Sequence, residues 1–341
     1  MVWVDKMKLH YYIITRMLLI IPTVVILLST VFFLMHIIPG DPVRVMYGEE
    51  LPEESIQQIR HTLGLDRPMY IQYTDYMTNF FRGDLGISFI YKIPVIEKIM
   101  YVYPVTIELT VFSILLTVIM GVPLGILAAL KRDGFLDHLI RGVSLYLYSN
   151  PSFWTALLLQ LMFGLWLGVL PLSGRTPPGF AVERVTGLLT LDSLLALDFK
   201  SFFSALSYLV LPALSLSLGS LPMLSRITRA SLLDVLGEDY IKTARATGVS
   251  EIGIVYKHAL RNSILPVITS IGFSFIWLLG GATIIEQIFG LPGLGKLLID
   301  SMMGRDFNLL QGIVGVYAIV VVILNTFVDV VYAMADPRVK F

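Results

Sequence analysis

The stretch Arg226-ITRASLLDVLGEDYIKTARATGVSEIGIVYKHALRNSILP-Val267 is a polar segment between two long apolar runs. The flanking runs, Ser201–Ser225 and Asn262–Ile285, contain no Asp, Glu, Lys or Arg. Each can cross a bilayer as a helix, because roughly 20 residues at about 1.5 Å per residue cover the hydrocarbon thickness. The stretch therefore predicts a loop on one face of a membrane.

The loop sequence predicts two short helices joined by a glycine turn. Glu238 and Asp239 begin the first helix, where acidic side chains oppose the positive end of the helix dipole. Gly248 ends it, because the residue after a helix often needs a positive φ, which glycine adopts without strain. Ser250 is expected to cap the second helix, and Glu251 lies in its first turn.

Apolar residues in this loop favour a packed structure over a passive one. Ile241, Ala244 and Val249 form an expected apolar stripe that a purely solvated connecting loop would not need. A solvated loop remains one alternative. A DNA-binding helix-turn-helix is another, because it shows the same helix–glycine–helix pattern. No soluble domain surrounds the loop, and the formal net charge of the chain is zero, so nothing else favours nucleic acid.

Composition indicates that the chain is an integral membrane protein. Of its 341 residues, 56% are hydrophobic and 15% are charged, against about 25% charged in soluble domains. The mean hydropathy is +0.78. The chain has no cysteine, which excludes disulfides, thiolate metal sites and cysteine nucleophiles. The run Met17–Gly40 is longer than the apolar region of a signal peptide and lacks a small-x-small cleavage site, so we expect it to remain as a span.

Six charge-free runs are candidates for membrane spans, and an even number places both termini on one side. The third run is too long for one span alone, so we expect it to include a loop or a break. The short loop at Lys131-Arg132 and the basic central loop place both termini in the cytoplasm. The runs are Met17–Gly40, Leu109–Leu130, Gly142–Gly174, Ser201–Ser225, Asn262–Ile285 and Phe307–Val328.

Two of these runs contain residues that affect helix packing. Gly121-VPL-Gly125 has the small-xxx-small spacing that lets two helix backbones approach closely in lipid. Asn150, Pro151 and Ser152 interrupt the third run, and the carbonyls that a proline frees must face protein or a water-filled cavity. These three residues are candidates for lining a substrate path. A kink that neighbouring helices satisfy is the alternative.

Residues 41–104 predict a small helical insertion on the outer face. Helical spacing indicates one helix around Ile56 and a second over Tyr70–Phe81, followed by the turn Gly83-Asp84-Leu85-Gly86. A segment of this size cannot bury a stable core of its own, so we expect it to pack on the membrane domain. It is either a contact surface for an outer partner or a purely structural lid.

A second glycine-rich segment, Gly290-LPGL-Gly295-Lys296, matches the first seven positions of a phosphate-binding P-loop. Leu297 stands where a P-loop needs Ser or Thr for the magnesium ion, and no strand precedes the segment. A re-entrant or interfacial turn before the last span is the expected structure.

Several of these segments resemble one family. Asp239-YIKTARATG-Val249 and His258-ALRN-Ser263 resemble the cytoplasmic EAA loop of ABC importer permeases, and most closely that of the dipeptide/oligopeptide family. The chain departs from the general EAA pattern at Lys242 and Arg261. Further similarity lies in Leu63-GLDRP-Met69, Arg82-GDLGISF-Ile90, the segment that begins at Glu286, and Asp336-Pro337-Arg338.

The resemblance implies an all-α integral membrane protein with six transmembrane helices, of the type I ABC importer permease class. It implies cytoplasmic N-terminal residues with the first helix (1–40), an extracytoplasmic insertion (41–104), and a five-helix core (105–341) whose coupling loop spans 226–262. Asp84, Gly86, Pro292 and Gly293 would lie at the dock of a binding protein. The residues implied to contact an ATPase are Glu238, Asp239, Tyr240, Ile241, Ala244, Arg245, Gly248, His258 and Arg261.

The resemblance also implies partners and a location. The chain would be a non-catalytic subunit in a prokaryotic inner membrane, in contact with lipid. Its partners would be a second related permease, two ABC ATPase subunits and an extracytoplasmic binding protein. No catalytic residue, metal ligand or cofactor is implied in this chain, and ATP and magnesium would be used by the ATPases. The expected cargo is di- or oligopeptides, while nickel chelates, glutathione and sugars remain open.

Two other classes are weighed against this one. A secondary transporter needs ionisable groups near the bilayer midplane and an internal repeat. The six runs contain no Asp, Glu, Lys or Arg, and the two halves show no convincing repeat. Asp329, at the end of the last run, suits an interfacial anchor. His36 is the one other candidate for a proton relay, and it lies at the opposite end. An intramembrane metalloprotease would need a His-Glu-x-x-His motif, which the sequence lacks.

Overall fold

The computed structural model describes residues 9–37, 43–44, 52–62 and 64–335. Within these ranges the chain is helical, with a single isolated antiparallel bridge between Ile87 and Pro94. The predicted motif Asp336-Pro337-Arg338 and the first eight residues lie outside the described part. The helices are α1 (Leu9–Ile37), α3 (Glu53–Thr62), α4 (Met69–Phe81), α5 (Val95–Leu130), α6 (Phe135–Ser149), α7 (Ser152–Leu159), α8 (Leu189–Leu195), α9 (Phe199–Leu236), α10 (Asp239–Ala246), α11 (Glu251–Gly253), α12 (Leu260–Phe289), α13 (Leu294–Met303) and α14 (Phe307–Ala335), with π-helical segments η1 (Gln160–Trp166) and η2 (Ile254–Ala259).

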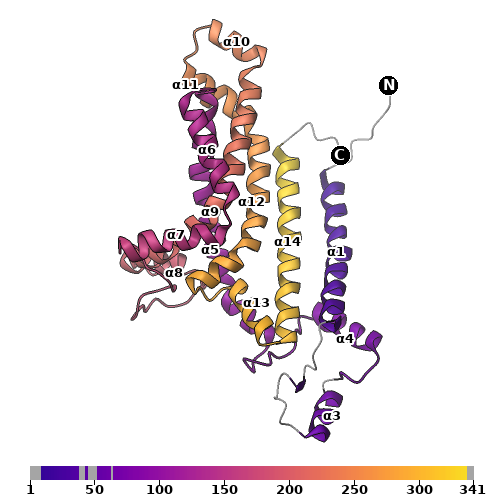
Figure 1. Cartoon of the computed structure of the whole chain (residues 1–341). Helices are drawn as coiled ribbons and strands as arrows, with labels where there is room; N and C mark the ends of the chain where they lie inside the picture. The colour runs from indigo at the N-terminus through magenta and orange to yellow at the C-terminus, as the bar shows by residue number, and fades with distance from the viewer. Residues whose placement is uncertain (1–8, 38–42, 45–51, 63, 336–341) are drawn as a thin grey trace, which may run out of the picture.

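Five of the described helices are long and apolar enough to cross a membrane: α1, α5, α9, α12 and α14. They match five of the six predicted runs. Figure 1 shows them side by side, with α10 and α11 at one end and α3, α4 and α13 at the other. The start of α1 and the end of α14 both lie toward the α10 end.

The third run does not form a straight span. It is divided between α6, α7 and η1, and Figure 1 shows α7 turning away from the axis of α6. Asn150 ends α6 in an extended conformation (φ −91°, ψ 134°), because the ring of Pro151 disfavours a helical residue before it. The prediction of six spans is therefore not matched one for one, and the break expected in the third run divides it into short helical segments.

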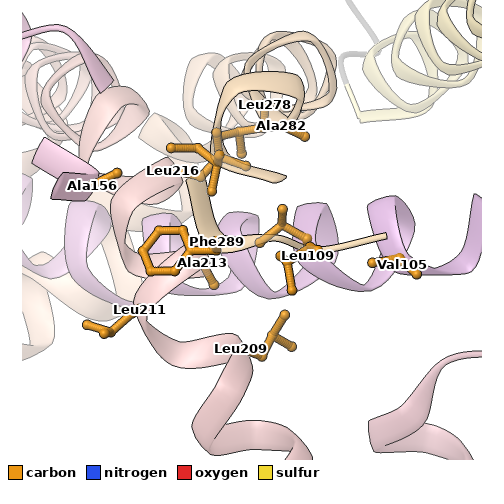
Figure 2. Close-up of a cluster of buried hydrophobic side chains, with 12 residues drawn as sticks. Val105, Leu109, Ala156, Leu209, Leu211, Ala213, Leu216, Leu278, Ala282 and Phe289 are labelled. Carbon is orange, nitrogen blue, oxygen red and sulfur yellow. The ribbon is translucent and has the colours of Figure 1, made fainter. Parts of the chain in front are cut away.

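The main core lies where α5, α9 and α12 meet. Its buried side chains include Leu109 of α5, Leu216 of α9, and Leu278 and Phe289 of α12 (Figure 2). Ala156 of α7 joins the same cluster, so the bent segment is packed against the bundle at this level. The three long helices thus form one unit that supports both ends of the molecule.

The small-residue spacing on α5 is confirmed as a close helix approach. Gly121 faces Leu224 of α9, and a Cβ added to Gly125 would lie 2.6 Å from both the carbonyl oxygen of Ser225 and the Cβ of Thr228. Any side chain at position 125 would push the two helices apart.

The insertion predicted for residues 41–104 packs on the long helices, as expected. Phe80 of α4 is buried with Val24 and Leu28 of α1. The buried carboxylate of Asp306, just before α14, accepts hydrogen bonds from Ser88 Oγ (2.5 Å) and the backbone N–H of Ile90 (3.0 Å). These contacts hold the described part of the insertion to α1 and to the residue before α14.

Replacing Gly125 with alanine should destabilise the bundle by about 1–3 kcal/mol, because the new methyl group overlaps the backbone of α9. The measurement is the thermal unfolding midpoint of the purified full chain in detergent. Gly280→Ala is the matched control, since Gly280 is also helical but has no atom within 4 Å of its Cβ position. Equal midpoints for the two variants would contradict the close approach.

Candidate functional site: the helical hairpin between α9 and α12

The segment from Asp239 to Ala259, which we call the hairpin, comprises α10, α11 and η2 and projects from the end of the bundle (Figure 1). The predicted glycine turn is confirmed: α10 ends at Ala246, and Gly248 has φ +83°. The predicted cap is also present, because Ser250 Oγ accepts a hydrogen bond from the N–H of Gly253 (3.3 Å). The hairpin follows α9 almost directly and continues into α12.

One face of the hairpin is anchored in the bundle. Ile241 is fully buried in a cluster formed with Ile126 and Ala129 of α5, Leu232 of α9 and the buried residues of η2. Ala244 packs at the edge of this cluster. Two of the three predicted stripe residues therefore face the protein, whereas Val249 is 36% exposed because it follows the turn at Gly248.

Polar contacts brace the two arms across the turn. Arg245 donates to Glu251 through Nε (2.7 Å) and Nη2 (3.2 Å), which joins α10 to α11. Asn262 Nδ2 donates to the hydroxyl of Tyr240 (2.7 Å), which joins α10 to the start of α12. The hairpin is consequently held as one body.

The opposite face of the hairpin is open. Ile252 is 74% exposed and Tyr256 is 61% exposed, one turn apart on the second arm, and Tyr240 is exposed on the first. Of the other predicted contact residues, Glu238, Asp239 and Arg261 are exposed and His258 is half-buried. Exposed apolar side chains grouped on a polar loop are a feature of protein-binding surfaces. Sequence reasoning missed Ile252 and Tyr256, although their spacing of four places them on one helical face.

A buried ion pair lies just below the hairpin. Asp137 of α6 is fully buried and accepts hydrogen bonds from Arg229 Nε (2.8 Å), Arg229 Nη2 (2.6 Å) and the N–H of Asp133 (3.0 Å). It ties the edge helix α6 to α9. Sequence reasoning did not find this pair, because its members are 92 positions apart.

The candidate path residues lie far from the hairpin along α6. Asn150 Nδ2 donates to the carbonyl of Tyr146 (2.7 Å), Pro151 precedes α7, and Ser152 is half-buried. The side chain of Asn150 thus satisfies a carbonyl in the last turn of α6.

The candidate dock residues fall at the opposite end of the molecule. Asp84 and Pro292 are exposed, Gly86 is half-buried and Gly293 is buried. A Cβ at Gly293 would overlap the carboxylate of Glu286. Gly293 is therefore placed to make room for that carboxylate rather than to form a surface.

The glycine-rich turn before α13 surrounds the buried side chain of Glu286. Its carboxylate is fully buried and accepts hydrogen bonds from Thr106 Oγ1 (2.6 Å) and the N–H of Lys296 (3.0 Å). Thr106 Oγ1 in turn accepts from the N–H of Leu294 (2.8 Å). The first amides of α13, which a P-loop would offer to phosphate, are occupied by the protein itself.

A second polar cluster ties the loop after η1 to the bundle. Glu108 of α5 accepts hydrogen bonds from Arg175 (2.7 Å) and from the N–H and hydroxyl of Thr190 (both 2.7 Å). Nearby, burial raises the pKa of Asp192, but hydrogen bonds from Thr186 and Gly187 outweigh it, so the pKa lies below its usual value. These contacts fix the loop that leads into α9.

Comparison with known proteins defines the family. Residues 121–341 match the family model for the inner membrane component of binding-protein-dependent transport systems, and residues 9–110 match the N-terminal model of such membrane components. The chain belongs to this permease family. The match spans the hairpin, α13 and the outer insertion.

Among its relatives, the di/tripeptide transport system permease protein DppB of Pseudomonas aeruginosa is 41% identical over 310 residues, covering 91% of this chain and 92% of that protein. The dipeptide permease protein DppB of Escherichia coli is 39% identical over 313 residues, with 91% and 92% covered. The DppB of Alkalihalophilus pseudofirmus is 36% identical over 332 residues, with 97% and 99% covered.

A solved structure supports the fold. A chain of the MetNI methionine ABC transporter in an inward-facing conformation superposes with a TM-score of 0.52 at 17% identity, covering 68% of this chain and 93% of that chain. The all-helical fold of the type I importer permeases is thereby confirmed for this chain.

Replacing Asp137 with asparagine should destabilise the chain by about 3–5 kcal/mol, because Arg229 would keep its charge in a largely buried site without a partner. The thermal unfolding midpoint of the full chain measures the effect. The double variant Asp137→Leu, Arg229→Met should recover most of the loss, since it removes both charges. Asp133→Asn is a control, because Asp133 is exposed. A midpoint for Asp137→Asn equal to that of the control would show that the pair contributes little.

Proposed function

We propose that this chain is the membrane-spanning permease subunit of an ATP-driven importer that moves di- and oligopeptides. An extracytoplasmic binding protein would deliver the peptide, and ATP and magnesium would be used by separate subunits. The single observation that carries the proposal is the hairpin: one face is anchored by Ile241, and the other presents Ile252 and Tyr256 to a partner.

The hairpin is well placed to transmit force. Because α10 follows α9 within two residues and η2 runs directly into α12, a displacement of the hairpin moves two core helices together. The buried contact of Ile241 with the end of α5 brings in a third. Closure of two ATPase subunits would tilt these helices as a unit between inward-open and outward-open states, a rigid-body change.

The proposed assembly contains two permeases and two ATPases, with the hairpin and both termini in the cytoplasm. The chain itself would be non-catalytic. The outer insertion and the turn at Pro292 would face the binding protein, and the break at Asn150–Ser152 would line part of the path. The names of the DppB relatives favour peptide cargo over a nickel chelate, glutathione or a sugar.

Replacing Ile252 with glutamate should weaken ATPase binding by about 30-fold, the effect expected of a central contact residue worth about 2 kcal/mol. The measurements are co-purification of ATPase subunits and uptake of a labelled tripeptide. Val185→Glu, the same change at an exposed position in an outer loop, is the control and should leave both unchanged. Full ATPase recovery with Ile252→Glu would refute this contact surface.

Replacing Gly248 with valine should abolish uptake while the chain still inserts, because a β-branched residue is strained at φ +83° and the turn between the arms would change shape. No atom lies within 4 Å of the Gly248 Cβ position, so a steric clash is not the cause. Uptake and membrane content are measured together, with Gly248→Asn as a milder variant that tolerates positive φ. Normal uptake by the valine variant would contradict the proposal that the hairpin couples the ATPase to transport.

A further inference from the structure

A cavity with a volume of about 940 Å³ lies between α6 and α9, beside the hairpin end. The end of α5 and the loop before α6 contribute to it. The cavity is distinct from the exposed face of Ile252 and Tyr256 and from the break at Asn150–Ser152. Its lining includes His138, Arg141, Leu145, Met223, Arg226 and Arg229.

The buried ion pair shows which residues of α6 and α9 lie at the same level beside the cavity. The helix α6 runs away from the hairpin end and α9 runs toward it (Figure 1). Asp137 of α6 pairs with Arg229 of α9. One turn deeper, four residues on from Asp137 and three back from Arg229, the two helices place Arg141 and Arg226 at the same level. Both arginines line the cavity.

Both arginines are exposed, and neither forms an ion pair with a carboxylate in the described part of the chain; Asp137, one turn before Arg141 on α6, is paired with Arg229. Arg226 donates only to the sulfur of Met223 (3.4 Å), while Arg229 is satisfied by Asp137 and Arg132 by Asp133. The remaining acid of the lining, Asp234, lies eight residues from Arg226 toward the hairpin end of α9, which is about 12 Å of helix. Two guanidinium groups facing one cavity favour an anion there.

The cavity lining becomes apolar with distance from the hairpin end. Beyond Arg141 and Arg226 it is formed by Leu145 and Tyr148 of α6 and by Pro222 and Met223 of α9. Leu145 and Tyr148 are themselves strongly exposed. Arginines toward the hairpin end and apolar side chains further along the two helices match an amphiphile with an anionic head. They do not match a soluble anion, which would leave the apolar part unused.

We propose that this cavity binds an anionic phospholipid, with Arg141 and Arg226 donating to its phosphate and an acyl chain lying along Leu145, Tyr148 and Met223. The bound lipid would fill the space between the edge helix α6 and α9, next to the ion pair that joins them. If lipid only surrounded the helices evenly, the amount of retained anionic lipid would not depend on these two arginines.

The test uses the full chain purified from membranes with the subunits that accompany it, in nanodiscs of mixed phosphatidylglycerol and phosphatidylcholine. Native mass spectrometry of the released complex should show retained phosphatidylglycerol. The variant Arg141→Gln, Arg226→Gln should reduce that retention by about tenfold or more, because each basic group near the surface contributes to anionic lipid binding. Lys131→Gln, Lys257→Gln, which removes two charges outside the cavity, should not. Equal retention in both variants would overturn the proposal.

Two further experiments distinguish a lipid headgroup from a soluble phosphate or a protein partner in the cavity. Glycerol 1-phosphate should fail to displace the lipid; displacement at matched concentration would mean a site for a soluble phosphate and would overturn the lipid assignment. The chain has no cysteine, so Leu145→Cys can carry a single photo-crosslinker with both arginines intact. Capture of phospholipid supports the site, and capture of a second protein subunit in its place rejects it.

Discussion

The burial of Ile241 against the ends of α5 and α9 is the contact on which the rest of the arrangement depends. Without it, the segment between α9 and α12 would be a tether, and a movement at its tip would not reach the membrane helices. With it, the hairpin belongs to the same packed body as the three core helices. The ion pair between Arg245 and Glu251 adds rigidity within the hairpin but little stability, because exposed pairs contribute about 0–1 kcal/mol.

Buried carboxylates hold the irregular parts of the chain in place. Asp137 ties α6 to α9, and Glu108 ties the loop after η1 to α5. Glu286 caps the start of α13, and Asp306 holds the segment before α5 against the start of α14. Lipid supplies no hydrophobic drive between helices, so polar contacts and close packing must define how they associate. Each of these acids accepts several hydrogen bonds, which offsets the penalty of burying its charge. These four acids therefore fix the described loop segments that they contact.

How much of the structure could be predicted from the sequence depends on how far apart in the chain the interacting residues lie. The long apolar runs, the turn at Gly248 and the close approach at Gly125 are local patterns, and the structure has them. The direction in which α7 leaves the bundle depends on distant packing around Ala156, so Pro151 could indicate a break but not its geometry. The partner of Asp137 is likewise set by the fold. The functional roles proposed for the hairpin residues, the break and the outer turn remain predictions.

The position of α9 links the hairpin to the cavity beside it. This helix carries Leu232, which packs under Ile241, and one turn earlier Arg229, which holds α6. A further turn earlier it carries Arg226, which faces the cavity. Tilting α9 would therefore change the separation of the two arginines at the level where α6 and α9 meet. A lipid phosphate that bridges them would favour the tilt in which both guanidinium groups reach it, so the membrane's anionic lipid content would bias the same helix that the hairpin moves.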